Sequence, residues 1–194
     1  MYKYFKRFLD IVLSAAGLLV LSPILLIIAV AIKLDSKGPV LFKQKRVAKG
    51  KEHFQILKFR TMYADVPKDV PTHLLADPES KITKIGRFLR KSSLDELPQI
   101  WNILVGEMSI IGPRPALWNQ FDLIAERDKY GANDVRPGLT GLAQVMGRDE
   151  LPIDIKAKYD GEYAQNVTFT NDVKIFFKTI TSVLGAKGVK EGKQ

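Results

Sequence analysis

The sequence predicts an α+β, membrane-associated fold with a proline-broken N-terminal membrane helix, a β-hairpin, and amphipathic interfacial and globular helices. Three observations predict it. The stretch Ile11–Ile32 is apolar and uncharged, with Ser22-Pro23 at its middle. The run Val40-Leu41-Phe42 leads to a turn near Lys49-Gly50, and His53 to Thr61 follows it, which suggests a β-hairpin. Beyond residue 80, apolar residues recur at helical spacing.

The apolar stretch is long enough to cross a bilayer as a continuous helix, at about 1.5 Å of rise per residue. Pro23 lacks an amide hydrogen and clashes with the carbonyl four residues back, so we expect a sharp bend there. Cationic residues flank both ends of the stretch, with Lys6 and Arg7 before it and Lys33 and Lys37 at its end. The positive-inside rule places both flanks in the cytoplasm, which a re-entrant helix satisfies.

Two other fates of this segment fit the same residues. A single straight span with a proline kink is the commonest outcome for such a helix. Ala29-Val30-Ala31 resembles a signal-peptidase site, although the apolar stretch exceeds the roughly 7–15 residues of a signal core. The segment alone therefore leaves its topology open.

The composition limits the chemistry that the chain can perform. Thirty Lys and Arg residues against 21 Asp and Glu give a net charge of +9, which favours anionic partners such as phosphates or acidic lipids. The chain contains no cysteine and only two histidines, His53 and His73. Thiol nucleophiles and thiolate metal sites are therefore excluded, and catalysis must come from carboxylates, hydroxyls or amines.

The second strand of the predicted hairpin, His53 to Thr61, contains two cations on one face. Lys58 and Arg60 are two residues apart, so their side chains would project together, about 7 Å apart. They could clamp a phosphate group. The alternative is a pair of solvated cations on an edge strand.

Five helical segments are predicted after the hairpin. The first helical segment, residues 81–91, is amphipathic and basic, so it could rest on acidic headgroups or simply face water. Residues 64–80 contain three prolines and are predicted to form a loop that could act as a lid. We expect a membrane helix over 1–35, a catalytic domain over 36–184 and a polar tail over 185–194. Further helices are expected over 93–108, 117–125, 153–163 and 172–184.

Asp95 and Glu96 form the most informative local pattern, within Ser93-Leu94-Asp95-Glu96-Leu97-Pro98-Gln99. Ser93 and Glu96 have the spacing of a capping box, and acidic residues suit the first turn of a helix. The same positive potential would keep a nucleophilic carboxylate ionised. Neighbouring helical side chains point about 100° apart, so one carboxylate could attack while the other binds a metal or orients a neighbour.

Three arginines lie in loops that contain proline or glycine. Arg114 stands between Pro113 and Pro115, Arg136 precedes Pro137, and Arg148 follows Gly147. Such loops can present guanidinium groups with little entropy left to lose, and arginine binds phosphate in a bidentate manner. Each alone is an ordinary loop residue, but three in a small chain indicate a diphosphate site.

Taken together, these motifs resemble the bacterial sugar transferases known as monotopic phosphoglycosyl transferases. The resemblance extends from about Lys6 to about Leu184 and depends on the order of the motifs, since each is weak alone. The matching motifs are Ser22-Pro23, Lys58-Phe59-Arg60-Thr61-Met62, Ser93-Leu94-Asp95-Glu96-Leu97-Pro98-Gln99, Gly112-Pro113-Arg114-Pro115 and Arg136-Pro137-Gly138-Leu139-Thr140-Gly141.

The resemblance implies a two-step transfer. Asp95 would attack the sugar-linked phosphate of a UDP-sugar and release UMP, and polyprenyl phosphate, such as undecaprenyl phosphate, would then take the sugar phosphate. Glu96, with Asp95, would bind Mg2+, which offsets diphosphate charge. The candidates for phosphate or nucleotide contacts are Lys58, Arg60, Arg114, Arg136 and Arg148.

The resemblance also implies a location and a set of partners. The helix broken at Ser22-Pro23 would enter and leave one leaflet of the bacterial inner membrane, with the catalytic domain on the cytoplasmic face. Membrane lipid, a UDP-sugar and polyprenyl phosphate are the expected partners, and a homodimer is an open option. Compared with longer relatives, the chain is expected to be the minimal catalytic form. The rival functions are a bitopic anchor with a basic binding domain and, because of the +9 charge, nucleic-acid binding, for which no motif is present.

Overall fold

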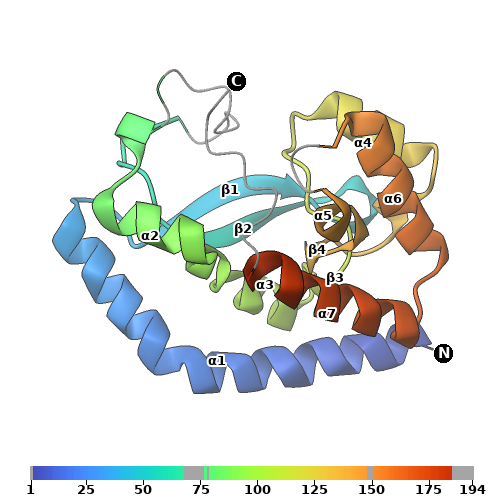
Figure 1. Ribbon diagram of the computed structural model, residues 1–194, viewed down its shortest axis with the longest axis horizontal. Helices are drawn as coiled ribbons and strands as arrows, with labels where there is room; N and C mark the ends of the chain where they lie inside the picture. The colour runs from blue at the N-terminus through green and yellow to red at the C-terminus, as the bar shows by residue number, and fades with distance from the viewer. Residues whose placement is uncertain (1, 68–76, 78, 148–150, 185–194) are drawn as a thin grey trace.

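The computed structural model describes residues 2–67, 77, 79–147 and 151–184. Two small sheets, β1 with β2 and β3 with β4, lie among seven helices of these residues (Figure 1). The elements in chain order are α1 (Tyr2–Asp35), β1 (Leu41–Val47), β2 (His53–Phe59), α2 (Lys84–Ser92), α3 (Gln99–Val105), β3 (Ser109–Ile111), α4 (Phe121–Asp128), β4 (Gly138–Thr140), α5 (Leu142–Met146), α6 (Ile153–Gln165) and α7 (Phe169–Leu184).

The long N-terminal helix α1 bends near its middle and supports the rest of the molecule on its two arms (Figure 1). Pro23 lies inside it and cannot donate to the carbonyl of Leu19, four residues back. The hydroxyl of Ser22 donates to that carbonyl instead, at 2.8 Å. The predicted bend is confirmed, and Ser22 satisfies the acceptor that the proline leaves open.

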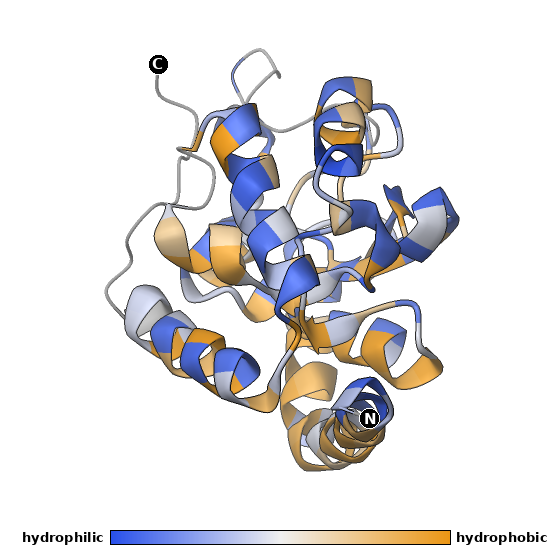
Figure 2. Ribbon diagram, turned by 90° about the vertical axis from the view of Figure 1, so that its right-hand side faces the viewer, coloured by the Kyte–Doolittle hydropathy of each residue, from blue (hydrophilic) through white to orange (hydrophobic). Residues whose placement is uncertain are grey.

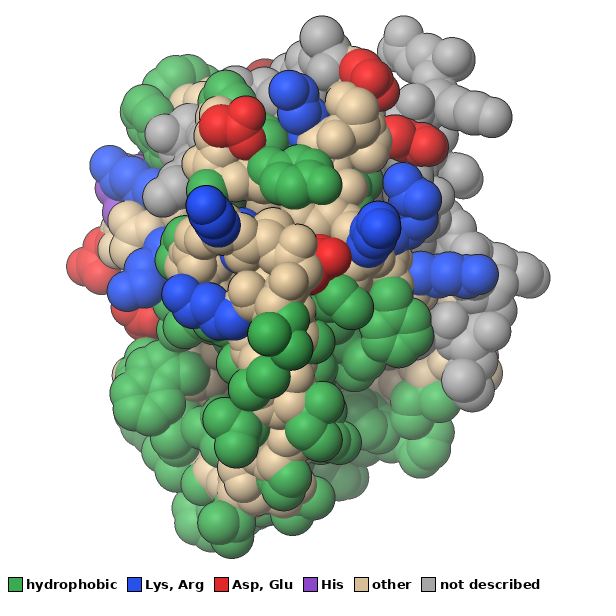
Figure 3. Space-filling view, turned by 90° about the vertical axis from the view of Figure 1, so that its left-hand side faces the viewer, with side chains coloured by type: hydrophobic (Ala, Val, Ile, Leu, Met, Phe, Trp, Pro, Cys, Tyr) green, Lys and Arg blue, Asp and Glu red, His purple; other side chains and the backbone are tan. Residues whose placement is uncertain are grey.

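Much of the surface of α1 is apolar and uncovered. By its length and composition, α1 could cross a membrane, and only 11% of its most apolar 18-residue stretch is buried. The side chains of Leu19 and Leu26 are 77% and 67% exposed. In Figure 2 much of the ribbon of α1 has the colour of hydrophobic residues, and Figure 3 shows Lys and Arg side chains above an apolar lower face. An apolar surface of this extent needs a non-aqueous environment or a partner.

The predicted hairpin is confirmed. Strands β1 and β2 are antiparallel, with Leu41 opposite Phe59 and Val47 opposite His53. Gly50, in the connecting turn, has a φ of 67°, a conformation that glycine adopts without strain. On the buried face of β2, Phe54 and Ile56 pack against residues of α3 and of the segment that follows it.

The short helix α2 confirms the predicted amphipathic basic helix. Thr83 caps its start by accepting a hydrogen bond from the amide of Gly86. Gly86 lies so close to the hairpin that a Cβ there would stand 2.0 Å from the carbonyl oxygen of Thr61. Glycine at this position therefore lets α2 pack directly on the segment that follows β2.

Two helix predictions differ from the structure. The helix expected over 93–108 is confined to α3, because Ser93 has a left-handed φ of 57° and ends α2. The helix expected over 117–125 begins only at Phe121. The helices expected over 153–163 and 172–184 are confirmed by α6 and α7.

A parallel pair of short strands was not predicted. Strands β3 and β4 pair through Ser109 with Gly138 and Ile111 with Thr140. Each has three residues, too few to show an alternating pattern in the sequence. The pair joins the segment before Arg114 to the segment after Arg136.

Polar contacts fix the N-terminal arm of α1 to the body. Arg7 donates to the carbonyls of Ile103 and Leu104 at the end of α3, at 2.6 and 2.7 Å. Asp10, which is buried, accepts from the amide of Ile110 at 3.0 Å. Lys6 forms an ion pair of 2.7 Å with Asp172 of α7. The helix therefore has a defined orientation relative to the rest of the chain.

Candidate active site

Asp95 and Glu96 lie in a 3-10 turn, Leu94–Glu96, between α2 and α3. The predicted capping box is not formed, because Ser93 makes no side-chain cap and Pro98 precedes α3 instead. The amide of Ser93 donates to the carbonyl of Arg90, as expected at the end of α2. The helix-capping interpretation was wrong, and the two carboxylates belong to a separate turn.

Two cations hold the Glu96 carboxylate. Lys58 Nζ and an Arg114 guanidinium nitrogen each lie 2.8 Å from Glu96 Oε1. Burial alone would raise the pKa of Glu96, but the charges and hydrogen bonds of Arg114 and Lys58 outweigh it and lower the pKa far below its usual range. Glu96 is therefore fully ionised at neutral pH.

The electrostatic environment of Asp95 is different. Burial is the largest effect on its pKa and raises it, and the neighbouring charge of Glu96 raises it further. Lys58, Arg90 and Arg114 act in the opposite direction without cancelling the rise. Two adjacent carboxylates whose pKa values move apart suit two different chemical roles.

Lys58 reaches this turn because strand β2 is fixed to helix α3. The side chain of Asn102, on α3, accepts from the amide of Leu57 at 3.0 Å and donates to the carbonyl of Gln55 at 2.9 Å. These two bonds hold β2 beside the helix that follows the 3-10 turn. Lys58, next along the strand from Leu57, then points to Glu96.

Arg114 reaches Glu96 from a loop whose carbonyl groups are all hydrogen-bonded. Pro113 and Pro115 fix φ on both sides of Arg114, and neither has an amide hydrogen to donate. Donors from four different positions bind four successive carbonyls of the loop. The bonds are Gly138 N to Pro113 O (2.8 Å), Arg127 to Arg114 O (2.9 Å), Arg46 to Pro115 O (3.0 Å) and Val47 N to Ala116 O (3.0 Å).

The expected clamp of Lys58 and Arg60 is not formed. Strand β2 ends at Phe59, and Arg60 turns away from the site. Its guanidinium donates to the carbonyls of three residues after α1, at 2.7–2.8 Å, and only 4% of the residue is exposed. Arg60 thus fixes the connection between α1 and β1, and the prediction of a shared phosphate face was wrong. The three acceptors are Ser36, Lys37 and Pro39.

The other two predicted arginines are not brought to Glu96 in the structure. Arg136 is exposed and donates to the carbonyl of Gly106 at 3.0 Å, at the end of α3 opposite to the Asp95–Glu96 turn. Arg148 lies outside the described residues, and so does most of the loop predicted to be a lid. The described site therefore consists of Asp95, Glu96, Lys58 and Arg114.

Sequence reasoning missed two further arginines. Arg46, on β1, is largely buried beside Glu96, and burial, with the nearby charge of Arg114, lowers its pKa to about 9. Arg127, on α4, forms a buried ion pair with Asp160 of α6. No local pattern marks either arginine as part of the site, because Arg46 reaches it through the carbonyl of Pro115 and Arg127 through Asp160, both distant in the sequence.

The donor set of the site fits a magnesium ion. Mg2+ is commonly bound by one or two carboxylates together with substrate phosphates and water. Asp95 and Glu96 provide two adjacent carboxylates, and Glu96 is held ionised. Among the described residues, no group of three or more His, Cys, Asp and Glu side chains could hold a metal alone.

These features define a class of protein: a small α+β body on a bent apolar helix, with a cation-bound carboxylate pair. The family model described as "Bacterial sugar transferase" matches residues 1–186. The chain belongs to the bacterial sugar transferase family. The resemblance inferred from the motifs is confirmed.

Relatives with related names support this assignment. The chain is 41% identical over 193 residues to a UDP-glucose:undecaprenyl-phosphate glucose-1-phosphate transferase from Caulobacter vibrioides, covering 92% of the chain and 69% of that protein. It is 39% identical over 195 residues to a UDP-N-acetylgalactosamine-undecaprenyl-phosphate N-acetylgalactosaminephosphotransferase from Aeromonas hydrophila, covering 97% and 46%. With exopolysaccharide production protein ExoY from Sinorhizobium fredii, it shares 33% identity over 94% of the chain and 87% of the relative. The chain thus spans under half of one of these relatives and most of the other two.

Proposed function

We propose that this protein transfers a sugar 1-phosphate from a UDP-sugar to a polyprenyl phosphate such as undecaprenyl phosphate. The observation that carries the proposal is Glu96 bound by Lys58 and Arg114, directly beside the more basic carboxylate of Asp95. The names of relatives, which include undecaprenyl-phosphate transferases for glucose and N-acetylgalactosamine, support the reaction class. The same step would begin the assembly of a surface glycan.

In the first half-reaction, a carboxylate oxygen of Asp95 attacks the phosphorus that carries the sugar. The bond between this phosphorus and the oxygen bridging the two phosphates breaks, and UMP leaves with that oxygen. An acyl phosphate linking Asp95 to the sugar remains. Asp95 must be ionised to attack, and its raised pKa makes it a stronger nucleophile than an ordinary aspartate once it is ionised.

In the second half-reaction, an oxygen of the polyprenyl phosphate attacks the same phosphorus. The bond to the Asp95 carboxylate breaks, a polyprenyl diphosphosugar forms, and the carboxylate is regenerated. Each step exchanges one oxygen–phosphorus bond for another, so no oxidant or reductant is needed. Asp95 therefore takes the sugar phosphate from the donor in the first step and gives it to the acceptor in the second.

The cations next to Asp95 would balance the charge of the diphosphate. Lys58 and Arg114 already lie 2.8 Å from Glu96 Oε1, and both influence the pKa of Asp95. Phosphate oxygens can share these donors with Glu96, because guanidinium and ammonium groups each have several hydrogens. We also propose that Arg136 and Arg148 contact the nucleotide.

Glu96 and Asp95 would hold Mg2+ when it is bound with the donor. The ion would offset diphosphate charge and assist departure of UMP. Glu96 also has a role that needs no metal: its negative charge holds Lys58 and Arg114 in position before the substrate arrives. A site organised in this way needs little rearrangement when the phosphates bind.

We propose that α1 is re-entrant, with both ends at the cytoplasmic face of the inner membrane. Its bend, its exposed apolar surface and the cations at its two ends support this topology. The Ser22 hydroxyl allows the bend to exist in lipid, because the carbonyl of Leu19 would otherwise have no donor there. Polyprenyl phosphate could then meet Asp95 near the headgroup level.

Release of UMP tests the reaction. Purified protein is incubated with Mg2+, undecaprenyl phosphate and each common UDP-sugar, and UMP and the lipid product are measured. We expect one or more donors to give UMP and a polyprenyl diphosphosugar, and Asp95→Asn to abolish both. If no donor is consumed, or if Asp95→Asn retains wild-type turnover, the proposal is wrong and an anchoring or binding role is favoured. Mass analysis of the lipid product identifies the sugar.

Labelling of introduced cysteines tests the topology separately. The chain has no native cysteine, so Lys3→Cys and Lys37→Cys each provide a single reactive thiol. In intact spheroplasts, an impermeant maleimide should leave both positions unlabelled, and permeabilisation should expose both. Labelling of only one position in intact spheroplasts would mean that α1 spans the membrane.

A further inference from the structure

The ion pair between Arg127 and Asp160 is among the most buried polar contacts of the described residues. Their side chains are 5% and 1% exposed. Two guanidinium nitrogens of Arg127 lie 2.8 and 2.5 Å from the same oxygen, Asp160 Oδ2. Burying such a pair carries a desolvation cost that apolar residues of similar size would avoid. The pair therefore calls for an explanation other than stability.

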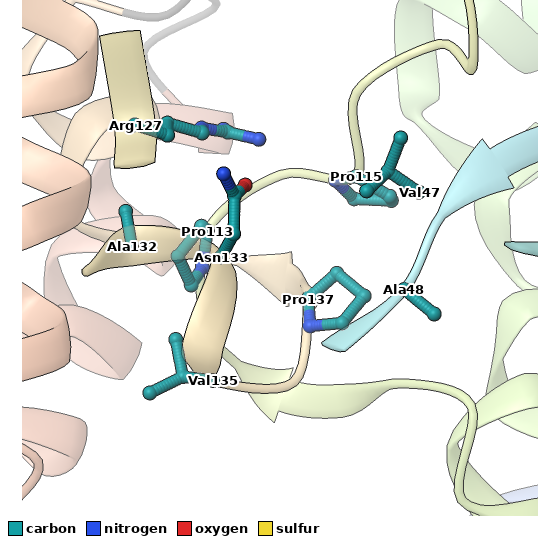
Figure 4. Close-up of a pocket in the computed structure, with 9 residues that line it drawn as sticks. All are labelled: Val47, Ala48, Pro113, Pro115, Arg127, Ala132, Asn133, Val135 and Pro137. Carbon is teal, nitrogen blue, oxygen red and sulfur yellow. The ribbon is translucent and has the colours of Figure 1, made fainter. Parts of the chain in front are cut away.

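A third contact of Arg127 explains why the ion pair is buried there. Its guanidinium also donates to the carbonyl of Arg114, at 2.9 Å. Figure 4 shows the Arg127 side chain extending from α4 toward the loop that carries Pro113 and Pro115. The direction of that carbonyl is set by ψ of Arg114, the rotation about its Cα–C bond. Pro115 restricts this angle but does not fix it. Fixing the carbonyl therefore fixes the direction in which Arg114 leaves the backbone.

The packing of α4 on α6 is adapted to this contact. Gly161, next to Asp160, lies so close to Tyr130 that a Cβ there would stand 2.3 Å from the Tyr130 Cβ. The absence of a side chain lets the end of α4 approach α6. Arg127, one turn earlier on the chain, can then reach both Asp160 and the Arg114 carbonyl.

The cavity next to these residues is too small to offer another explanation. It is lined by Arg127, Asn133, Pro113 and Pro115, among others (Figure 4). Its volume is about 10 Å³. This is room for about one water molecule and not for a nucleotide base or a sugar. This cavity, as the described residues line it, therefore offers Arg127 no substrate pocket.

We infer that Arg127, held by Asp160, is a positioning residue that aims Arg114 at Glu96 and at the phosphates of the donor. The chain of contacts runs from Asp160 through Arg127 to the Arg114 backbone, and from the Arg114 side chain to Glu96 Oε1. The inference rests on the proposed function for its effect on turnover. Its structural part, the control of Arg114 by Arg127, does not depend on any activity.

An apolar double replacement separates positioning from stability. Arg127→Met with Asp160→Val removes both charges and the hydrogen bond to Arg114, and leaves no buried charge without a partner. We expect a Tm close to that of the wild type and a loss of about tenfold in kcat/KM for the UDP-sugar, the size expected when one positioning hydrogen bond is lost. As a matched control, Lys129→Gln with Glu126→Gln removes an exposed ion pair at the end of the same helix and should leave kcat/KM unchanged.

Mutant backgrounds show whether the effect passes through Arg114. In an Arg114→Ala background, the double replacement should change kcat/KM by less than twofold. In a Lys58→Ala background, the same replacement should still cost about tenfold. Equal losses in both backgrounds would overturn the inference. Where the double replacement does not fold, Arg127→Lys serves instead, since it keeps a charge beside Asp160 and loses the planar fork.

A readout without turnover distinguishes failure of the inference from failure of the proposed function. The mobility of the Arg114 side chain is measured by 15N relaxation of its guanidinium group in detergent, for the wild type, for the double replacement and for the Lys129→Gln/Glu126→Gln control. Because Arg127 holds the carbonyl of Arg114, whose side chain binds Glu96, the guanidinium should become more mobile in the double replacement and stay unchanged in the control. Unchanged mobility in the double replacement would refute positioning by Arg127. Absence of UMP release from the wild type would refute only the proposed reaction.

Discussion

Glu96→Gln removes the negative charge that Lys58 and Arg114 share, and keeps the size of the side chain. Each cation now makes a charge-assisted hydrogen bond of 2.8 Å to Glu96 Oε1. Hydrogen bonds to charged groups contribute about 1.5–3 kcal/mol each and neutral ones about 0.5–1.5 kcal/mol. Because glutamine can still accept from both cations, we expect a loss of about 1 kcal/mol per bond, or about 2 kcal/mol in total.

The assay is thermal unfolding in detergent at pH 7. At about 2–4 °C per kcal/mol for a chain of this size, Glu96→Gln should lower Tm by about 4–8 °C. Asp95→Asn is the matched control, and its effect should have the opposite sign. Burial raises the pKa of Asp95, so its charge is unfavourable in the folded protein and its removal should raise Tm. Equal losses in the two variants, or no loss in Glu96→Gln, would refute this description of the site.

The pH dependence gives a second check on the same pair. The pKa of Glu96 is lowered on folding, so its contribution to stability is fully present above the unfolded value near 4.5 and lost as the pH falls through the folded value. The difference in Tm between wild type and Glu96→Gln should therefore be constant near neutrality and shrink in acid. A difference that grows below pH 4.5 would contradict the assignment.

Three further predictions concern other parts of the chain. Arg60→Ala removes three hydrogen bonds to backbone carbonyls and should lower the free energy of unfolding by about 2–4 kcal/mol in chemical denaturation. Arg87→Ala, on the exposed side of α2, should change it by less than about 0.5 kcal/mol. Similar effects of the two substitutions would mean that Arg60 does not fix the α1–β1 connection. Gly86→Ala places a Cβ 2.0 Å from the carbonyl oxygen of Thr61 and should lower Tm more than Gly50→Ala, where the space is open but φ is positive. A larger loss in Tm for Gly50→Ala would contradict the close packing of α2. In rapid-quench measurements with the donor alone, the rate of UMP release should fall about tenfold per pH unit below the pKa of Asp95. The fall should begin above the ordinary aspartate pKa of 3.8. A rate that stays constant down to pH 3.8 would contradict the raised pKa of Asp95.

Apolar residues that recur with the period of the element were sufficient to predict the hairpin, α2 and α7. Helix α6 was predicted as well, although its buried residues include Asp160 and Gly161 beside Ala157 and Tyr163. The bend in α1 was predictable from Pro23 for a local reason, since proline cannot donate to the carbonyl of Leu19. The pair β3 and β4 was not predictable, because its two strands of three residues are paired across the sequence from Ser109 to Gly138.

The candidate site was predicted in part. Lys58, Glu96 and Arg114 come together as expected, but Arg60 does not, because β2 ends before it and three carbonyls take its hydrogen-bond donors. Ser93 has the spacing of a capping box and still adopts the left-handed conformation that ends α2. The sequence alone could not predict the position of Arg60, since its acceptors Ser36, Lys37 and Pro39 are distant in the sequence.

The measurement that tests the central claim most directly is the intact mass of the protein after incubation with a UDP-sugar and Mg2+, without the lipid acceptor. We predict an increase equal to one sugar phosphate, located at Asp95 by peptide mapping and lost when undecaprenyl phosphate is added. Asp95→Asn should show no such increase. Release of UMP with no covalent adduct, or an adduct on a residue other than Asp95, would contradict the mechanism.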